Sequence, residues 1–187
     1  MGVSNVLTVF RIFCVPLFVL SLVYYDKIWE ATPFLIFCVA SFTDVLDGAI
    51  ALLFRQKTPL GAILDPLADK ILLNAAFISL SIPNSFTKIS PFSFPLYVPA
   101  VVVSRDIILI TGIFIFIKLK HRFEIKPTVI GKICTFLQVL SVGLVLLGSG
   151  LSPLGWKVAT IWTIISGFDY LIRGFYFLTR KSGKYGR

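Results

Sequence analysis

The sequence predicts an all-α integral membrane protein, a bundle of six transmembrane helices with a polar site that faces the cytoplasm. Of the 187 residues, 57% are hydrophobic and the mean hydropathy is +0.91, whereas a soluble domain is roughly 45–50% apolar. The apolar residues form stretches on the order of 20 residues, the length that crosses a bilayer as a helix. No polar linker divides the chain, so residues 1–187 are expected to form a single domain.

The first three predicted helices are Val6–Tyr25, Ala31–Phe54 and Leu60–Ile82. Each is an apolar run that ends where polar or proline-containing sequence begins. Asp26–Glu30 separates the first helix from the second, and Arg55–Pro59 separates the second from the third. The second and third helices therefore form a hairpin.

The last three predicted helices are Leu96–Ile117, Val129–Leu147 and Leu154–Leu178. A Pro- and Ser-rich stretch, residues 83–95, precedes them. Proline lacks an amide N–H and is tolerated at a helix boundary. Prolines at or near the predicted boundaries support these limits: Pro33, Pro59, Pro95, Pro127 and Pro153.

The basic residues of the connections indicate the topology, because cytoplasmic loops collect lysine and arginine. Both termini are expected in the cytoplasm, in a multi-pass protein of the cytoplasmic or inner membrane. Anionic lipid and this topology explain the net charge of +9, and no basic patch with interleaved aromatic residues indicates a nucleic-acid partner. The cytoplasmic side would contain Arg55, Lys57, Lys118, Lys120, Arg122, Lys126, Arg180, Lys181, Lys184 and Arg187, and the other side Lys27, Lys88 and Lys157.

Two further features carry no functional signal. The first apolar stretch is interrupted by Asn5, Thr8 and Arg11, so it is expected to remain as a helix and not to be cleaved as a signal peptide. The three cysteines lack metal-type spacing and are expected to be small core or lipid-facing residues: Cys14, Cys38 and Cys134.

Four carboxylates stand in apolar sequence on the two sides of the Arg55–Pro59 connection. A carboxylate is costly to place in a low-dielectric environment without a compensating cation, and only Arg55 and Lys70 lie close in sequence. Divalent metal ions bound by the carboxylate oxygens would compensate this negative charge. The predicted metal ligands are Asp44, Asp47, Asp65 and Asp69.

The spacing of these acids places each pair on one face of a helix. Asp44 and Asp47 are three residues apart, and Asp65 and Asp69 are four apart, which are same-face separations. Two facing helices would bring the carboxylates to one point, where two ions could clamp the attacking and leaving oxygens of a phosphoryl transfer. Small residues beside the acids leave room for a bulky phosphate ligand: Gly48, Ala51 and Gly61.

Other charged side chains lie in or beside the predicted spans, where an ionisable residue indicates a functional role. Arg11 either meets a cluster carboxylate or a substrate phosphate, or is an interfacial arginine that extends to the membrane surface. Arg105 either forms an ion pair with its neighbour Asp106 or joins Lys132 and Lys70 in an anion pocket, for which a guanidinium is well suited. Two residues of the last helix are expected to pair with each other: Asp169 and Arg173.

The acidic pattern resembles the signature of the CDP-alcohol phosphotransferase family, D-x-x-D-G-x-x-A-R, eight residues, then G-x-x-x-D-x-x-x-D, and it is closest to the phosphatidylglycerophosphate and cardiolipin synthases. Every signature position is matched except one, where Leu52 stands in place of Arg; the role of that Arg toward the nucleotide is absent or passes to a neighbour such as Arg55. The resemblance implies two Mg²⁺ or Mn²⁺ ions at the four aspartates, Asp69 as general base, and a homodimer. It also implies a cytidine nucleotide packed against Gly48, Ala51 and Gly61.

The resemblance implies transfer of a phosphatidyl group from CDP-diacylglycerol to an alcohol, with release of CMP. A pocket that contains Arg105 and Lys132 favours a phosphorylated alcohol over serine or a neutral sugar. Glycerol 3-phosphate is therefore the expected acceptor, and phosphatidylglycerophosphate is then the product. Residues 104–106 and 126–128 also resemble cardiolipin synthases, whose acceptor is phosphatidylglycerol. An ion or metal transporter would instead spread its acids along a path through several helices. The expected acceptor-binding residues are Arg11, Lys70, Arg105 and Lys132.

Overall fold

The part of the chain that the structure describes is helical and contains no strand. This computed structural model describes the backbone of residues 3–27, 29–54, 61–82, 92–118 and 128–182, and within these the side chains of residues 10–25, 27, 29–43, 70–82, 92–112 and 128–174. The helices are α1 (Val3–Val23), the short 3₁₀ helix η1 (Tyr25–Lys27), α2 (Thr32–Phe54), α3 (Gly61–Ser79), α4 (Tyr97–Lys118), α5 (Val129–Leu146) and α6 (Ser152–Ser182).

All six predicted helices are confirmed, with ends that lie within about four residues of the predicted limits, and two of the larger differences have local causes. The third helix stops at Ser79 and not at Ile82, since Ile82 precedes Pro83 and a residue before proline disfavours the α conformation. The last helix continues beyond Leu178 to Ser182, because lysine and arginine are good helix formers even where the apolar pattern ends. Its 31 residues correspond to about 46 Å at 1.5 Å per residue.

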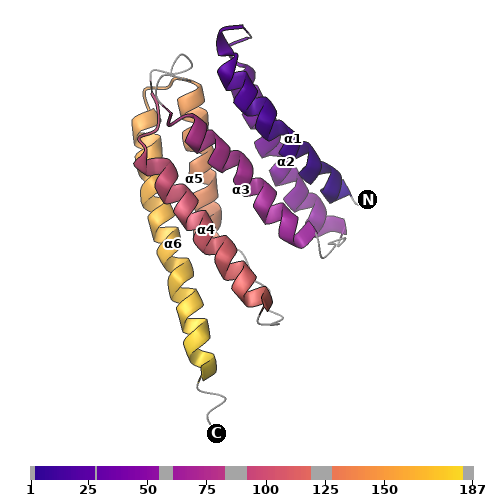
Figure 1. The fold of residues 1–187 in the computed structure, drawn as a ribbon, viewed down its shortest axis with the longest axis vertical. Helices are drawn as coiled ribbons and strands as arrows, with labels where there is room; N and C mark the ends of the chain where they lie inside the picture. The colour runs from indigo at the N-terminus through magenta and orange to yellow at the C-terminus, as the bar shows by residue number, and fades with distance from the viewer. Residues whose placement is uncertain (1–2, 28, 55–60, 83–91, 119–127, 183–187) are drawn as a thin grey trace.

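The helices form two groups that lie side by side (Figure 1). In one group α1 packs against both α2 and α3, and in the other α6 packs against both α4 and α5. The groups meet where α3 contacts α4 and α5, and where α2 contacts α5. The ends of α2, α4 and α6 and the starts of α1 and α3 point toward the lower end of Figure 1, so the two halves of the acidic signature lie toward that end.

Aromatic side chains fill the core toward the opposite end. The ring centroids of Phe77 and Phe94 are 4.8 Å apart, and Phe94 lies 5.8 Å from Trp156, which joins α3 and α6 through the segment before α4. Phe18 of α1 and Phe37 of α2 are 5.9 Å apart. Offset and edge-on rings at these distances are favourable contacts beyond their burial of area. The cysteine interpretation is confirmed in part, because Cys14 and Cys134 are buried and Cys38 is partly buried.

A glycine turn reverses the chain between α5 and α6. Gly148 has φ of 61°, a left-handed conformation that glycine adopts without steric cost. Its amide donates to the carbonyl of Val145 at 3.0 Å, and the amide of Ser149 donates to the carbonyl of Leu144 at 3.1 Å, which satisfies the last carbonyls of α5 as a Schellman motif. The turn sets α6 against α5 along their length.

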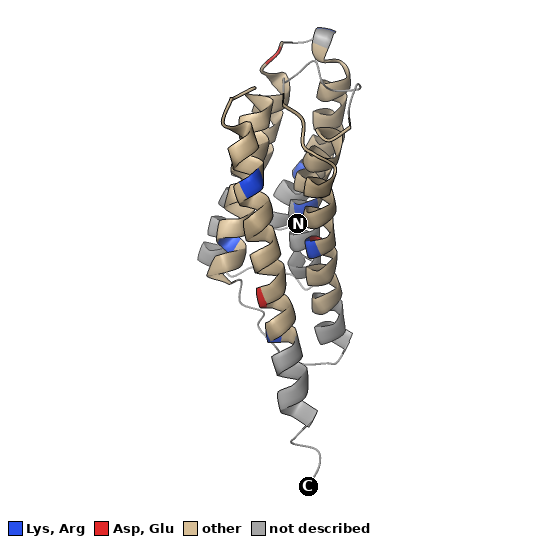
Figure 2. Cartoon of the chain, turned by 90° about the vertical axis from the view of Figure 1, so that its left-hand side faces the viewer, with Lys and Arg blue, Asp and Glu red and all other residues tan. Residues whose placement is uncertain are grey.

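The described helices expose large apolar side chains and bury several charged ones. Large side chains such as Phe13, Phe136 and Ile172 are each 66% exposed, whereas Arg105 and Asp106 are buried. Figure 2 shows how few charged residues the described helices contain. By length and apolar composition, one helix among the described residues, Val129–Leu146, could cross a membrane, and shorter apolar helices are Phe10–Val23, Thr32–Thr43 and Lys70–Ser79.

Candidate functional site

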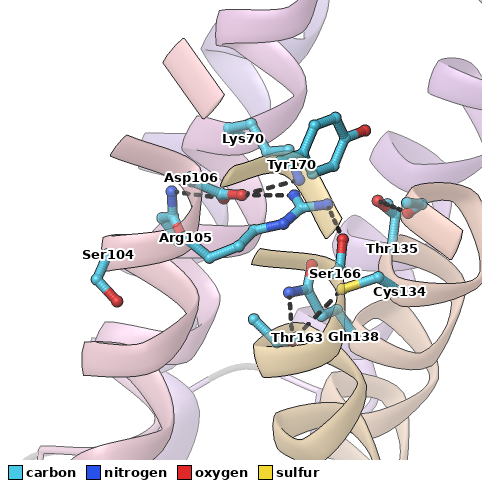
Figure 3. Close-up of polar contacts among 12 residues, drawn as sticks. Lys70, Ser104, Arg105, Asp106, Cys134, Thr135, Gln138, Thr163, Ser166 and Tyr170 are labelled. Atoms are coloured by element: carbon cyan, nitrogen blue, oxygen red, sulfur yellow. Dashed lines mark hydrogen bonds and ion pairs between the residues drawn. The ribbon is translucent and has the colours of Figure 1, made fainter. Parts of the chain in front are cut away.

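A buried charge cluster joins α3 to α4 in the interior of the bundle. Oδ1 of Asp106 lies 3.1 Å from Nζ of Lys70 and 2.9 Å from Nη1 of Arg105. The amide nitrogen of Asn74, one turn after Lys70 on α3, donates to the other carboxylate oxygen of Asp106 at 3.3 Å. Both oxygens of Asp106 are therefore occupied, and one carboxylate compensates two cations (Figure 3).

Helix α6 contributes two contacts to the guanidinium of Arg105. Nη2 of Arg105 donates to Oγ of Ser166 at 2.9 Å. The carbon Cζ of Arg105 lies 5.5 Å from the centre of the Tyr170 ring, within the range of a cation–π contact. A Cβ added to Gly167 would lie 3.6 Å from Cγ of Arg105, so the arginine stem runs close along the backbone of α6. Figure 3 shows Ser166 and Tyr170 on neighbouring turns of this helix.

The charges of the cluster do not balance among the described residues. Lys70 and Arg105 are two cations beside the single anion Asp106, and Arg105 is 4% exposed. Nε of Arg105 is buried without a hydrogen-bond partner. A buried cation requires a compensating partner, so the surplus positive charge and the available N–H suit an anionic ligand. Phosphate, which guanidinium groups bind through two parallel hydrogen bonds, fits this chemistry.

A second polar network lies between α5 and α6. The side-chain amide of Gln138 donates to Oγ1 of Thr163 at 3.0 Å, and that hydroxyl donates to the carbonyl of Ala159 at 2.7 Å. Sγ of Cys134 lies 3.4 Å from the same hydroxyl. Gln138 and Thr163 are fully buried. Hydrogen bonds inside an apolar bundle fix how its helices pack, so this network sets the position of α6, from which Ser166 reaches Arg105.

The four expected acceptor-binding residues differ in their burial and in their surroundings. Lys70 and Arg105 meet at Asp106. Arg11 is buried on α1, at 2% exposure. Lys132, on the first turn of α5, is exposed and has no ion pair with a described residue. The ion-pair interpretation of Arg105 is thus confirmed, and Lys70 shares the same carboxylate. The anion pocket of Arg105, Lys132 and Lys70 stays a prediction.

The acidic signature lies on the predicted helices. Asp44 and Asp47 are in the C-terminal half of α2, with Gly48 and Ala51, and Asp65 and Asp69 are in the N-terminal half of α3, which begins at Gly61. The side chains of these residues lie outside the described ones, and Arg55 lies outside the described backbone. Lys70 is the first described side chain of α3 and directly follows Asp69, so the charge cluster begins one residue after the signature ends.

The sequence interpretation missed three residues of this cluster: Asn74, Ser166 and Tyr170. Asn74 lies four residues after Lys70, and Ser166 lies four residues before Tyr170, which are separations that share a helix face. This spacing is a usable signal. It does not identify the partner, because only the packing of α6 against α4 brings these side chains to Arg105. The predicted pairing of Asp169 with Arg173 is confirmed at 2.8 Å.

Comparisons with known proteins agree with the signature. The sequence model of one family, described as CDP-alcohol phosphatidyltransferase, matches residues 1–168. A protein of Mycobacterium tuberculosis named "Probable phosphatidylglycerophosphate synthase" is 30% identical over 182 residues, covering 92% of this chain and 81% of that protein. Proteins named "CDP-diacylglycerol--glycerol-3-phosphate 3-phosphatidyltransferase" are 37% identical over 141 residues in Haemophilus influenzae, covering 73% of this chain and 71% of that protein, and 27% identical over 178 residues in Rickettsia felis, covering 90% and 93%. The chain therefore belongs to the CDP-alcohol phosphatidyltransferase family.

Proposed function

We propose that the protein transfers the phosphatidyl group of CDP-diacylglycerol to glycerol 3-phosphate, giving phosphatidylglycerophosphate and CMP. One observation carries the choice of acceptor. Among the described residues, the buried cluster of Lys70 and Arg105 on Asp106 has surplus positive charge, and it begins at the residue after Asp69, the last acid of the signature. A phosphate-bearing acceptor would supply the missing anion, and relatives named for glycerol 3-phosphate span most of the chain.

Asp44, Asp47, Asp65 and Asp69 would hold the metal. Their carboxylate oxygens are the hard donors that Mg²⁺ and Mn²⁺ prefer, and their spacing on α2 and α3 keeps each pair on one helix face. Two such ions, when bound, would neutralise the diphosphate and stabilise the charge on the departing CMP. Gly48, Ala51 and Gly61 would leave room for the cytidine nucleotide beside these helices. The roles of these residues are assigned from their match to the family signature.

The chain's own residues then account for the transfer. Asp69 would accept the proton of an acceptor hydroxyl, and the oxygen of that hydroxyl forms a bond to the phosphorus that carries the diacylglycerol. The bond from this phosphorus to the bridging oxygen of the diphosphate breaks, and CMP leaves with that oxygen. Arg105 and Lys70 would bind the free phosphate of glycerol 3-phosphate and so orient its hydroxyl, with Arg11 and Lys132 as further candidates for contacts to phosphate.

The surface of the bundle supports a multi-pass membrane location. Many large apolar side chains of the described helices are exposed while Arg11, Arg105 and Asp106 are buried, which is unusual for a soluble protein and is the pattern expected in lipid. With both termini in the cytoplasm, the signature ends of α2 and α3 would face the cytoplasm, where glycerol 3-phosphate is available. From the family resemblance we also propose that the protein forms a homodimer.

Release of CMP from CDP-diacylglycerol tests this function. Purified protein in detergent with Mg²⁺ should release CMP when glycerol 3-phosphate is added and form phosphatidylglycerophosphate. Phosphatidylglycerol and inositol phosphate serve as competing acceptors in the same assay. Turnover with phosphatidylglycerol but not with glycerol 3-phosphate would move the assignment to cardiolipin synthesis. Absence of CMP release with every acceptor would favour a transporter, and the Asp69→Asn variant is the control for background hydrolysis.

A further inference from the structure

We propose that Ser166 and Tyr170 of α6 are positioning residues, which fix the guanidinium plane of Arg105 and thereby set the affinity for the phosphate of the acceptor. The inference rests on the proposed function, which assigns that phosphate to Arg105. It adds a part of the site from the last helix, far in sequence from the acidic signature. Neither residue needs to touch the substrate for this role.

The guanidinium is held by two hydrogen bonds and by one aromatic ring. Nη1 donates to Asp106 at 2.9 Å and Nη2 donates to Ser166 at 2.9 Å, while the Tyr170 ring lies 5.5 Å from Cζ. Nε has no partner and is buried. A planar group fixed by two hydrogen bonds has one orientation, and its remaining N–H groups then point in defined directions. Ser166 thus determines where Nε and the free hydrogens of the guanidinium are presented.

This positioning matters because bidentate binding of phosphate depends on the orientation of the guanidinium plane. Asp106 alone cannot fix this plane, since it is the residue next to Arg105 on α4 and its Oδ1 is shared with Lys70. Ser166 provides a second point from another helix. Without the contact to Ser166, the guanidinium can rotate about its hydrogen bond to Asp106. Phosphate binding must then also order the arginine side chain.

Tyr170 acts through its ring and not through its hydroxyl. The hydroxyl of Thr128 lies 3.5 Å from that of Tyr170, a long contact that contributes little. The ring covers the guanidinium at cation–π distance. Removal of the hydroxyl alone should therefore leave the position of Arg105 unchanged, whereas removal of the ring should release it. This distinction separates a positioning role from a general requirement for tyrosine.

The main test compares two buried serines. Ser166→Ala removes the hydrogen bond to Arg105, whereas Ser141→Ala removes a fully buried hydroxyl that donates to the carbonyl of Gln138. We expect Ser166→Ala to raise the KM for glycerol 3-phosphate about tenfold, the effect of one weakened hydrogen bond to a charged group. The KM for CDP-diacylglycerol and the melting temperature should change no more than in Ser141→Ala. Ser166→Thr keeps the hydroxyl and should restore the acceptor KM.

Two variants of Tyr170 provide an independent test. Tyr170→Phe should keep the wild-type KM for glycerol 3-phosphate, and Tyr170→Leu should raise it several-fold. Equal changes in the KM values of both substrates for Ser166→Ala, or a fall in melting temperature with unchanged KM values, would show that α6 only supports the fold and would overturn the inference. If Ser166→Thr does not fold, the comparison of Ser166→Ala with Ser141→Ala decides.

A binding measurement keeps this inference separate from the proposed function. Inorganic phosphate, added without divalent metal, should raise the melting temperature of the wild type and raise that of Ser166→Ala less. This result does not depend on which alcohol is the acceptor. If the wild type does not use glycerol 3-phosphate but shows the phosphate effect, the function is revised and the positioning role stands. If phosphate stabilises wild type and Ser166→Ala equally, the positioning role is wrong even where the wild type is active.

Discussion

Nζ of Lys70 lies 3.1 Å from Oδ1 of Asp106, so an ion pair joins α3 to α4 inside the bundle. The same oxygen also lies 2.9 Å from Nη1 of Arg105. Asp106 is therefore the residue on which the charge cluster depends, since it compensates both cations and is itself 2% exposed. Its removal would leave two buried cations without the one carboxylate that the described residues provide for them.

We expect Asp106→Asn to destabilise the protein strongly. Breaking a buried ion pair by removal of one partner costs about 3–5 kcal/mol, because the remaining charge is left buried without compensation. Adding Lys70→Met to this variant should recover part of the loss, since Arg105 is then the one cation of the cluster left without a carboxylate. The measurement is thermal unfolding in detergent for both single variants and the double variant.

The control for this cycle is the pair of Asp169 and Arg173, whose atoms are 2.8 Å apart but whose arginine side chain is 61% exposed. Arg173→Gln should cost no more than about 0.5 kcal/mol, the usual contribution of an exposed pair four residues apart. If Asp106→Asn and Arg173→Gln lower the melting temperature equally, the buried cluster has no special weight in stability.

Gly131 makes room for Tyr170, and a methyl group there should displace it. A Cβ added at Gly131 would lie 2.7 Å from the Tyr170 hydroxyl oxygen, closer than atoms approach without a shift. Gly131→Ala should therefore move Tyr170 off Arg105 and raise the KM for glycerol 3-phosphate. Tyr170→Phe removes the clashing oxygen, so the double variant should recover the wild-type KM. Gly112→Ala, where nothing lies within 4 Å, is the control and should not change it. A double variant no better than Gly131→Ala would show that the clash is not the cause.

The fold could be predicted from the sequence because its signals are local. Apolar runs fix where helices can form, and charged or proline-containing connections end them, so α1 to α6 were expected nearly at their observed limits. The pairing of Asp169 with Arg173 was predictable for the same reason, as both residues stand on one face of one helix. The end of α3 at Ser79 needed the effect of Pro83 on Ile82, which an apolar pattern does not include.

Only the charged residues of the candidate site could be predicted from the sequence. Lys70, Arg105 and Asp106 were identifiable because charge is rare in apolar sequence. Ser166 was not, since a serine or threonine hydroxyl in an apolar helix commonly donates to its own helix, as Thr160 does to the carbonyl of Trp156. Tyr170 was not, since an aromatic ring in an apolar helix commonly packs in the core or against lipid. Their role depends on the contact of α6 with α4, which no local pattern contains. Lys132 carried the same charge signal as Lys70 but is exposed in the described structure.

The carboxylates of the signature should be required individually for turnover. Asp44→Asn, Asp47→Asn and Asp65→Asn each replace a charged oxygen donor with a neutral, weaker ligand for a hard cation, so each should abolish metal-dependent release of CMP. Asp69→Asn should lose the proton acceptor and can retain nucleotide binding. Initial rates across a range of Mg²⁺ concentrations, with CDP binding measured in parallel, check both expectations. Asp169→Asn is the matched control outside the signature. Near-normal rates at low Mg²⁺ for two of the first three variants would contradict a site for two metal ions.

Leu52 is the one departure from the family signature, and Leu52→Arg restores the family residue. We expect a functional or improved enzyme, because the family accommodates arginine at this position of the helix and a cation there suits the nucleotide phosphates. The measurement is the KM for CDP-diacylglycerol. Leu53→Arg, which places the same charge on a different face of α2, is the control and should be less active. Loss of CDP-diacylglycerol binding in Leu52→Arg alone would show that the nucleotide pocket of this chain is arranged differently.

The acceptor assignment makes the last prediction, and it separates Arg105 from Lys132. If both residues bind the phosphate of glycerol 3-phosphate, Arg105→Gln and Lys132→Gln should each raise its KM on the order of tenfold to a hundredfold, since a charge-assisted hydrogen bond contributes roughly 1.5–3 kcal/mol. The KM for CDP-diacylglycerol should change much less. Arg105 is buried against Asp106 and Ser166, so its variant should also lower the melting temperature, whereas the exposed Lys132 should affect the KM without the melting temperature. Initial rates against each substrate at saturating Mg²⁺, with thermal unfolding of the same preparations, provide both values.

An unchanged acceptor KM in Lys132→Gln would limit the phosphate site to the cluster of Lys70 and Arg105. Equal effects on the KM values of both substrates in Arg105→Gln would assign that arginine to the fold or to the diphosphate.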